Sequence, residues 1–266
     1  MKTGIKYLLV TLLVLAAFPS MAQLETYLEL VYTQKSDGKV EFRSVLEDDD
    51  GEMVKGATVR YYSVLDESES SIGEAETNSE GVALLLLDNL SGLDMDSSHS
   101  FTVRAEFAGN SELETSEDEG TWKEIMMSLE LKEEEEEKIV GVQLNAWDEQ
   151  GELYPVEEGE VYFYVPRLFS LLPIGDAWTE EEGYDEIKFP SDLPGDQAGL
   201  VTVIARLEEH EEFGNVETQI DTNWGVIPTM ETSLPRALWS TRPPLWMVIT
   251  FVVLILAVEL ILNECQ

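Results

Sequence analysis

Residues 72–81 of this chain read IGEAETNSEG, and residues 174–183 read IGDAWTEEEG. The similarity continues on both sides. Most of the middle of the chain is therefore an internal repeat, with the two copies roughly 100 residues apart. A repeat of that length is a duplicated domain and not a solenoid unit. Further matching segments are 28–30 with 129–131, 51–53 with 151–153, 102–105 with 202–205, and 109–110 with 214–215. We therefore expect two equivalent domains, at residues 23–121 and 122–226.

Both copies contain short segments in which apolar and polar residues alternate. Residues 101–107 (FTVRAEF) and 201–207 (VTVIARL) have this period of two, which is typical of a strand with one buried face. Residues 59–62 and 161–164 are rich in aromatic and β-branched side chains, which also favour strands. Glycine-containing turns separate these segments. The sequence thus predicts an all-β body of two tandem immunoglobulin-like β-sandwiches.

The order of turn and strand motifs resembles the bacterial Ig-like repeats of cell-envelope proteins. In the first copy these motifs are GEMVKGATV at 51–59, AETNSEG at 75–81 and FAGN at 107–110. The second copy departs from the pattern, with Trp178 in place of Glu76 and Glu180 in place of Asn78. The whole chain is similar to membrane-anchored periplasmic proteins of Bacteroidota whose role is unknown. The resemblance implies a fold and an envelope location, but no activity.

The first residues are typical of a secretory signal. Two lysines precede an apolar run at 7–18, and the small residues at 20–22 suit cleavage by a signal peptidase. We therefore expect residues 1–22 to be a signal peptide, with the mature chain beginning at Gln23.

A second apolar run, at residues 245–262, has about the minimum length of a transmembrane helix. A proline-containing stalk at 227–244 precedes it, and a short tail at 263–266 follows. The tail is acidic, contrary to the positive-inside rule, whereas the expected signal peptide would still place the body outside the cytoplasm. We predict a single-pass protein of a bacterial inner membrane that faces the periplasm. The residues expected to anchor it in the bilayer are Trp239, Arg242, Trp246 and Glu259.

Glu259 lies inside the apolar run, and two explanations stay open for it. It either reaches the far interface or makes a polar contact with another membrane helix.

The composition restricts the possible partners. The chain has 54 acidic and 16 basic residues, for a net charge of −38. Nucleic acids and anionic membrane surfaces are therefore poor partners for the body, whereas basic proteins and metal cations stay possible. Cys265 is the only cysteine, so no disulfide links the two halves of either domain.

Residues that could carry chemistry are few. The only imidazoles are His99 and His210, and each is expected to be a solvated loop residue, because a catalytic zinc usually takes two or three histidines. Asp48–Asp50 has the oxygen density that Ca²⁺ prefers but lacks the spacing of an EF-hand loop, so an acidic turn is expected. The run Glu133–Glu137 is expected to be a solvated edge or loop. No catalytic set, cofactor site or metal site is predicted, and the protein is not expected to be an enzyme.

The strongest functional signal is a contrast between the copies. Residues 63–71 and 165–173 occupy matched positions and have equal length. The first segment is polar and acidic, and the second reads VPRLFSLLP. Exposed apolar residues beside an arginine are typical of binding surfaces, although internal packing would also explain them. The predicted partner-binding residues are Arg167, Leu168, Phe169, Leu171 and Leu172.

Two functions follow as hypotheses. The first is a membrane-tethered, extracytoplasmic interaction module, such as an accessory subunit that docks a basic or redox partner in an envelope complex. The alternative is a module that binds a small ligand, or a carbohydrate in a calcium-dependent manner. Exposed tryptophans on one face, drawn from Trp147, Trp178 and Trp224, would support that alternative.

Overall fold

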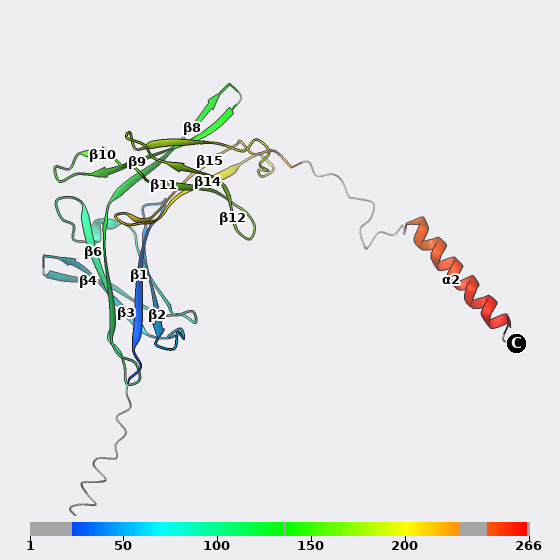
Figure 1. Ribbon diagram of the computed structural model, residues 1–266, viewed down its shortest axis with the longest axis horizontal. Helices are drawn as coiled ribbons and strands as arrows, with labels where there is room; N and C mark the ends of the chain where they lie inside the picture. Colours follow the sequence, from blue (N-terminus) through cyan, green and yellow to red (C-terminus); the bar gives the residue numbers. More distant parts are fainter. Residues whose placement is uncertain (1–22, 67, 136, 229–243, 265–266) are drawn as a thin grey trace, which may run out of the picture. The chain divides into compact units, whose positions relative to one another are not determined.

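The computed structural model describes residues 23–66, 68–135, 137–228 and 244–264 (Figure 1). The expected signal peptide at 1–22, most of the expected stalk with Trp239 and Arg242, and the side chain of Glu259 lie outside the described residues. The described chain divides into two compact units, one ending at Val226 and the other beginning at Ile227.

The first unit is built of short strands, as the alternating segments predicted. In β6, for example, every second side chain from Phe101 to Phe107 is buried. The strands of the first copy are β1 (Thr26–Gln34), β2 (Val40–Asp48), β3 (Thr58–Leu65), β4 (Ser68–Glu76), β5 (Val82–Leu87), β6 (Ser100–Phe107) and β7 (Ser116–Lys123). Those of the second are β8 (Ile125–Glu134), β9 (Glu137–Trp147), β10 (Leu153–Pro155), β11 (Glu160–Pro166), β12 (Leu171–Trp178), β13 (Tyr184–Lys188), β14 (Val201–His210) and β15 (Gly214–Thr222).

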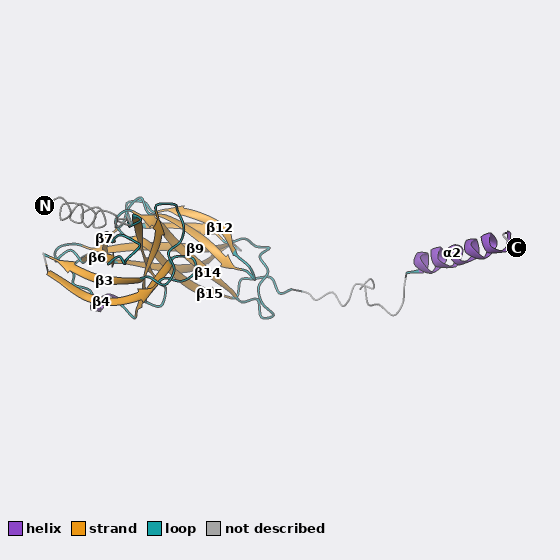
Figure 2. Ribbon diagram, turned by 90° about the horizontal axis from the view of Figure 1, so that it is seen from below, coloured by secondary structure: helices purple, strands orange, loops and turns teal. Residues whose placement is uncertain are grey.

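Each copy forms a sandwich of two antiparallel sheets. In the first copy, β1, β2 and β5 pair in one sheet, and β4, β3, β6 and β7 lie side by side in the other (Figure 2). The second copy pairs β8, β9 and β13 in one sheet and orders β12, β11, β14 and β15 in the other. The two copies therefore share one strand order, with β10 as a short addition beside β9. Because β4 pairs with β3, the order differs from that of constant-type immunoglobulin domains, whose fourth strand joins the first sheet.

Each sandwich has its own hydrophobic core. Tyr32, Phe42 and Phe101 are fully buried in the first, and Leu144, Phe163 and Phe213 in the second. The ring of Tyr32 lies 5.2 Å from that of Phe101, in an edge-to-face arrangement. Burial of one such side chain contributes about 1.5–3 kcal/mol, so these clusters stabilise each sandwich without a disulfide.

The turns of the two copies use equivalent residues. Asp48 Oδ1 accepts hydrogen bonds from the N–H groups of Asp50 and Glu52 at 3.1 and 2.9 Å. Asp148 makes the same bonds to Gln150 and Glu152 at 2.9 and 2.8 Å. The acidic turn predicted at Asp48–Asp50 is thus held by its own backbone, as Asx turns are.

The two sandwiches are joined by more than the chain. β7 extends to Lys123 and β8 begins at Ile125, so the change of sandwich lies at Glu124, just beyond the boundary expected after residue 121. The end of β1 also pairs in parallel with the start of β15, Thr33 opposite Asn215. This pairing merges one sheet of each copy into a seven-stranded sheet, with β5 and β12 at its two ends.

The second unit contains the helix α2 (Leu245–Glu264), which covers the expected transmembrane segment and places Trp246 near its start. Among the residues that the structure describes, no helix combines the length and apolarity needed to span a membrane.

Candidate functional site

The segment predicted to bind a partner forms the turn of the β11–β12 hairpin. Val165 is opposite Leu172, and Pro166 is opposite Leu171. The β3–β4 hairpin of the first copy has the same register, with Ser63 opposite Ser70, and both hairpins carry an irregularity at the matching position. The two segments of equal length are therefore structurally equivalent, and their tips can be compared residue by residue.

Leu168 and Phe169 make up the tip of the second hairpin. The backbone N–H of Arg167 donates to the carbonyl of Ser170 at 2.8 Å, which closes the turn around these two residues. Leu168 is 86 % exposed and Phe169 is 94 % exposed, so neither side chain packs against its own sandwich. At the matched positions the sequence of the first copy has Asp66 and Glu67.

Arg167 makes a contact with its own sandwich. Its Nη1 donates to the backbone carbonyl of Pro194 at 3.0 Å. Its Nη2 is buried and has no hydrogen-bond partner among the described residues. The guanidinium therefore fixes the base of the hairpin to the loop at Pro194, and this role was not predicted.

The remaining predicted residues lie on β12, which forms one end of the seven-stranded sheet. Leu172 is exposed and Leu171 is half-buried. Pro173 follows them, and proline has no N–H to offer to a further strand. The apolar surface available to a partner consequently consists of Leu168, Phe169 and Leu172.

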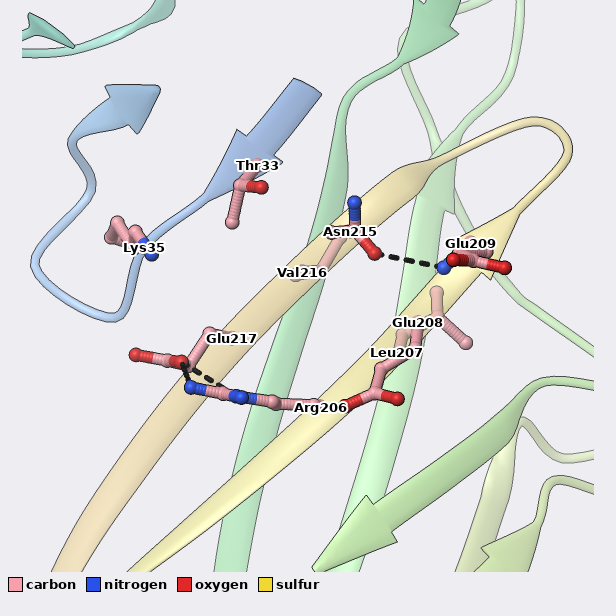
Figure 3. A pocket seen from close by; sticks show the side chains of 9 residues that line it. All are labelled: Thr33, Lys35, Arg206, Leu207, Glu208, Glu209, Asn215, Val216 and Glu217. Atoms are coloured by element: carbon pink, nitrogen blue, oxygen red, sulfur yellow. Dashed lines mark hydrogen bonds and ion pairs between the residues drawn. The ribbon is translucent and has the colours of Figure 1, made fainter. Parts of the chain in front are cut away.

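A second feature is a pocket of about 270 Å³ at the junction of β1 with β14 and β15 (Figure 3). Arg206 donates to Glu217 Oε2 from Nε at 2.7 Å, and its Nη2 lies 2.6 Å from the same oxygen. Asn215 uses its amide to accept from the N–H of Glu209 and to donate to the carbonyl of Tyr32. The polar groups of the pocket are thus largely satisfied within the protein, so the pocket offers few of them to a ligand.

His99 lies in a loop, as expected, and its side chain is partly exposed, but it also forms a contact between the sandwiches that was not predicted. Its Nδ1 lies 2.9 Å from Glu124 Oε2, and its ring stacks on Trp147 of the second sandwich at a centroid distance of 5.3 Å. The sequence could not show this, because 48 positions separate the two rings along the chain.

His210 is half-buried at the bend between β14 and β15. Its Nδ1 accepts from the N–H groups of Glu212 and Phe213 at 3.2 and 3.4 Å. Burial lowers the pKa of His210, while the nearby carboxylates of Glu212 and Glu211 act in the opposite direction. The imidazole therefore serves the turn in its neutral form.

The described residues contain no cluster of three or more His, Cys, Asp or Glu side chains arranged to hold a metal ion. The three tryptophans named for a carbohydrate platform also lie in different environments. Trp178 is exposed, Trp147 is half-buried, and Trp224 is only 6 % exposed. Trp224 Nε1 donates to Glu133 Oε1 at 2.6 Å, which gives one member of the acidic run a structural role.

One exposed apolar pair was missed by the sequence analysis. Leu84 and Leu86 lie on β5, at the opposite end of the seven-stranded sheet from β12. A comparison of the copies would have found them, because the aligned residues of the second copy are Glu186 and Lys188.

No family model and no curated protein matches this sequence. Among solved structures, the chain is similar to the tetra-tandem repeat in the extending region of a large adhesion protein, with 10 % identity over 75 % of this chain and 48 % of that one, at a TM-score of 0.28. It is also similar to the FN1–FN3 domains of chicken CNTN1, with 8 % identity over 75 % and 67 % of the two chains, at a TM-score of 0.31. The chain spans about half the length of the adhesion-protein repeat. Because these TM-scores are low, the assignment of an Ig- or fibronectin-like sandwich rests on the strand order described above.

Proposed function

We propose that this chain is a non-enzymatic interaction module that binds a partner protein through the tip of the β11–β12 hairpin. The observation that carries the proposal is the exposure of Leu168 and Phe169 on a turn whose base is fixed. The first copy has Asp66 and Glu67 at the matched sequence positions and still pairs Leu65 with Ser68, so this pairing does not require apolar residues there.

The tip can supply most of the binding free energy of a modest interface. Burial of one Leu or Phe side chain contributes about 1.5–3 kcal/mol, so burial of both corresponds to a change in Kd of about a hundredfold or more. Arg167 adds to this by holding the hairpin in place, which reduces the entropy lost on binding.

The charge of the chain favours a basic partner. A net charge of −38 attracts a positively charged protein over long distances and accelerates encounter. Such a partner could be a redox protein or another subunit of an envelope complex. The proposed location, outside the cytoplasm and attached to a membrane, is supported by the sequence at 1–22 and 245–262.

The experiment is cross-linking of the full chain in the membranes of its source cells, followed by mass spectrometry of captured proteins. The test variant is Leu168→Asp with Phe169→Glu, which installs the tip residues of the first copy. The control is Leu153→Asp, which changes an exposed leucine of the same sandwich outside the hairpin.

We expect the double variant to lose its captured partner at least tenfold while its unfolding midpoint stays unchanged, and the control to retain the partner. Retention of the partner by the double variant would contradict the proposal. Unfolding of the second sandwich in that variant would show that the tip serves packing.

A further inference from the structure

β5 ends the seven-stranded sheet in the first sandwich with an apolar edge. It pairs with β2 on one side, and no described strand pairs with its other side. Leu84 is 44 % exposed and Leu86 is 55 % exposed, both on the outer face of the sheet. Unpaired edges of this kind are templates for the addition of a further strand, and proteins usually protect them with charges.

The backbone of the same two leucines is directed outward. The carbonyl of Gly81 accepts from the N–H of Leu46 on β2, whereas the carbonyl of Val82 accepts from Asn78. Because successive residues of a strand present their N–H and C=O groups to opposite sides, those of Leu84 and Leu86 point away from β2. Within the described chain no hydrogen bond from another element reaches them.

The strand of the second sandwich that is equivalent to β5 carries charged residues in place of the two leucines. On β13, Glu186 replaces Leu84 and Lys188 replaces Leu86, in a strand that pairs with β9 in the matching register. Lys188 forms an ion pair with Glu137 at 2.7 Å, and Glu186 lies 3.7 Å from Lys132. The fold therefore accepts charged residues at both positions, so the leucines of the first copy are not needed for its architecture.

The ends of the β5 edge are negatively charged. Glu80 precedes the strand and Asp88 follows it, and both side chains are exposed. Neither carboxylate takes part in any of the ion pairs formed by the described residues. The edge thus presents an apolar centre between two unpaired negative charges.

We propose that the outer edge of β5 binds an extended segment of a partner protein, which adds to the sheet as a further strand. The backbone groups of Leu84 and Leu86 would pair with that segment, and its alternate apolar side chains would cover the two leucines. Lysine or arginine at both ends of the segment would meet Glu80 and Asp88. This surface is separate from the hairpin tip of the second sandwich.

One antiparallel register of a second copy of this chain is disfavoured at the edge. Antiparallel pairing of two β5 strands with Leu84 opposite Leu84 would place Glu80 opposite Asp88 at both ends. Like charges directly opposite one another destabilise a pair of strands. The charges of the edge oppose self-association in that register, whereas they attract a basic segment in every register.

The experiment uses a synthetic peptide, Lys-Lys-Val-Thr-Val-Thr-Val-Lys-Lys, titrated into the full chain by calorimetry. We expect binding that weakens as NaCl rises from about 50 to about 500 mM, because salt screens the terminal ion pairs. The protein variant Leu84→Glu with Leu86→Lys, which copies the edge of the second sandwich, should weaken binding by about tenfold or more. The variant Leu168→Asp with Phe169→Glu should leave peptide binding unchanged.

Two peptide controls test the edge even if the Leu84→Glu, Leu86→Lys protein fails to fold. A peptide N-methylated at alternate residues cannot donate to the edge, and one with Glu in place of Lys repels Glu80 and Asp88, so neither should bind. Absence of binding by the lysine-flanked peptide, or equal binding of the N-methylated peptide, would overturn the proposal. A chain that dimerises through Leu84 and Leu86 in sedimentation would also overturn it, in favour of a second copy as the occupant.

Discussion

The imidazole of His99 stacks on the indole of Trp147, with the two ring planes 14° apart, and thereby joins the first sandwich to the second. His99 has a positive φ of 59°, a conformation that is uncommon for L-residues but that histidine adopts more often than most. Lys123 makes a second contact between the sandwiches, with its Nζ donating to Tyr154 OH at 2.9 Å. A few side chains on either side of Glu124 therefore hold the junction.

The His99–Trp147 stack should appear as an energetic coupling. We expect His99→Ala and Trp147→Ala to show a coupling free energy of about 0.5–1.5 kcal/mol in a double-mutant cycle of urea unfolding, because a stacked aromatic pair is worth that much beyond its buried area. The control cycle pairs His99→Ala with Trp178→Ala, an exposed tryptophan that should give additive effects. Additivity in both cycles would show that the stack contributes nothing.

Replacement of Gly214, at the junction of the two sandwiches, should lower the free energy of unfolding. It has φ of 64°, and an added Cβ would lie 2.8 Å from Tyr32 Cδ1 and 3.0 Å from Trp122 Cδ1. The matched control is Gly151, with φ of 76° and open space around the added Cβ. We expect Gly151→Ala to cost about 1–2 kcal/mol of unfolding free energy and Gly214→Ala about 1–3 kcal/mol more, because only the second change also overpacks. Equal losses would mean that the junction can relax.

Stability should fall on mild acidification through His210. Burial lowers the pKa of His210 in the folded state below its usual value of about 6.5, so the unfolded chain binds the proton more tightly. The stability that neutral His210 contributes is fully present above the pKa of this histidine in the unfolded chain. That stability is lost as the pH falls below this pKa. We expect His210→Gln to flatten the pH dependence of urea unfolding between about pH 7.5 and pH 5.5. An NMR titration in which the His210 ring titrates above the unfolded value would reverse the sign and contradict this expectation.

Salt should stabilise the body. The described ion pairs are mostly exposed, and each stabilises the fold by about 0–1 kcal/mol. The chain has 54 acidic and 16 basic residues, and its excess negative charges repel one another over long distances. Raising NaCl from about 10 to about 500 mM screens that repulsion, because the Debye length falls from about 30 Å to below 10 Å. For a chain of this size each 1 kcal/mol gained raises the thermal midpoint by about 2–4 °C. A constant or falling midpoint would show that repulsion does not limit stability.

Comparison of the two copies in sequence predicted part of the structure of the β3–β4 and β11–β12 hairpins. Equal spacing predicted that residues 63–71 and 165–173 are equivalent, and the shared register confirms it. The same comparison drew attention to Leu168 and Phe169, whose side chains are exposed, but it did not predict the contact of Arg167 with Pro194. Composition distinguishes an apolar tip from an acidic one, yet it cannot show that a guanidinium turns back to the carbonyl of Pro194.

The sequence by itself determined the elements that depend on neighbours along the chain. Alternation of apolar residues marked strands such as β6 and β14, and the run Asp48–Asp50 marked the turn after β2, because a side chain that bonds its own backbone acts within a few residues. Only the tertiary structure decided that β1 pairs with β15, that His99 meets Trp147, and that no described strand pairs with the outer edge of β5. Those outcomes depend on backbone hydrogen bonds and on packing between segments far apart in the chain. Such bonds are the same for every residue type, so the sequence carries little record of where they form.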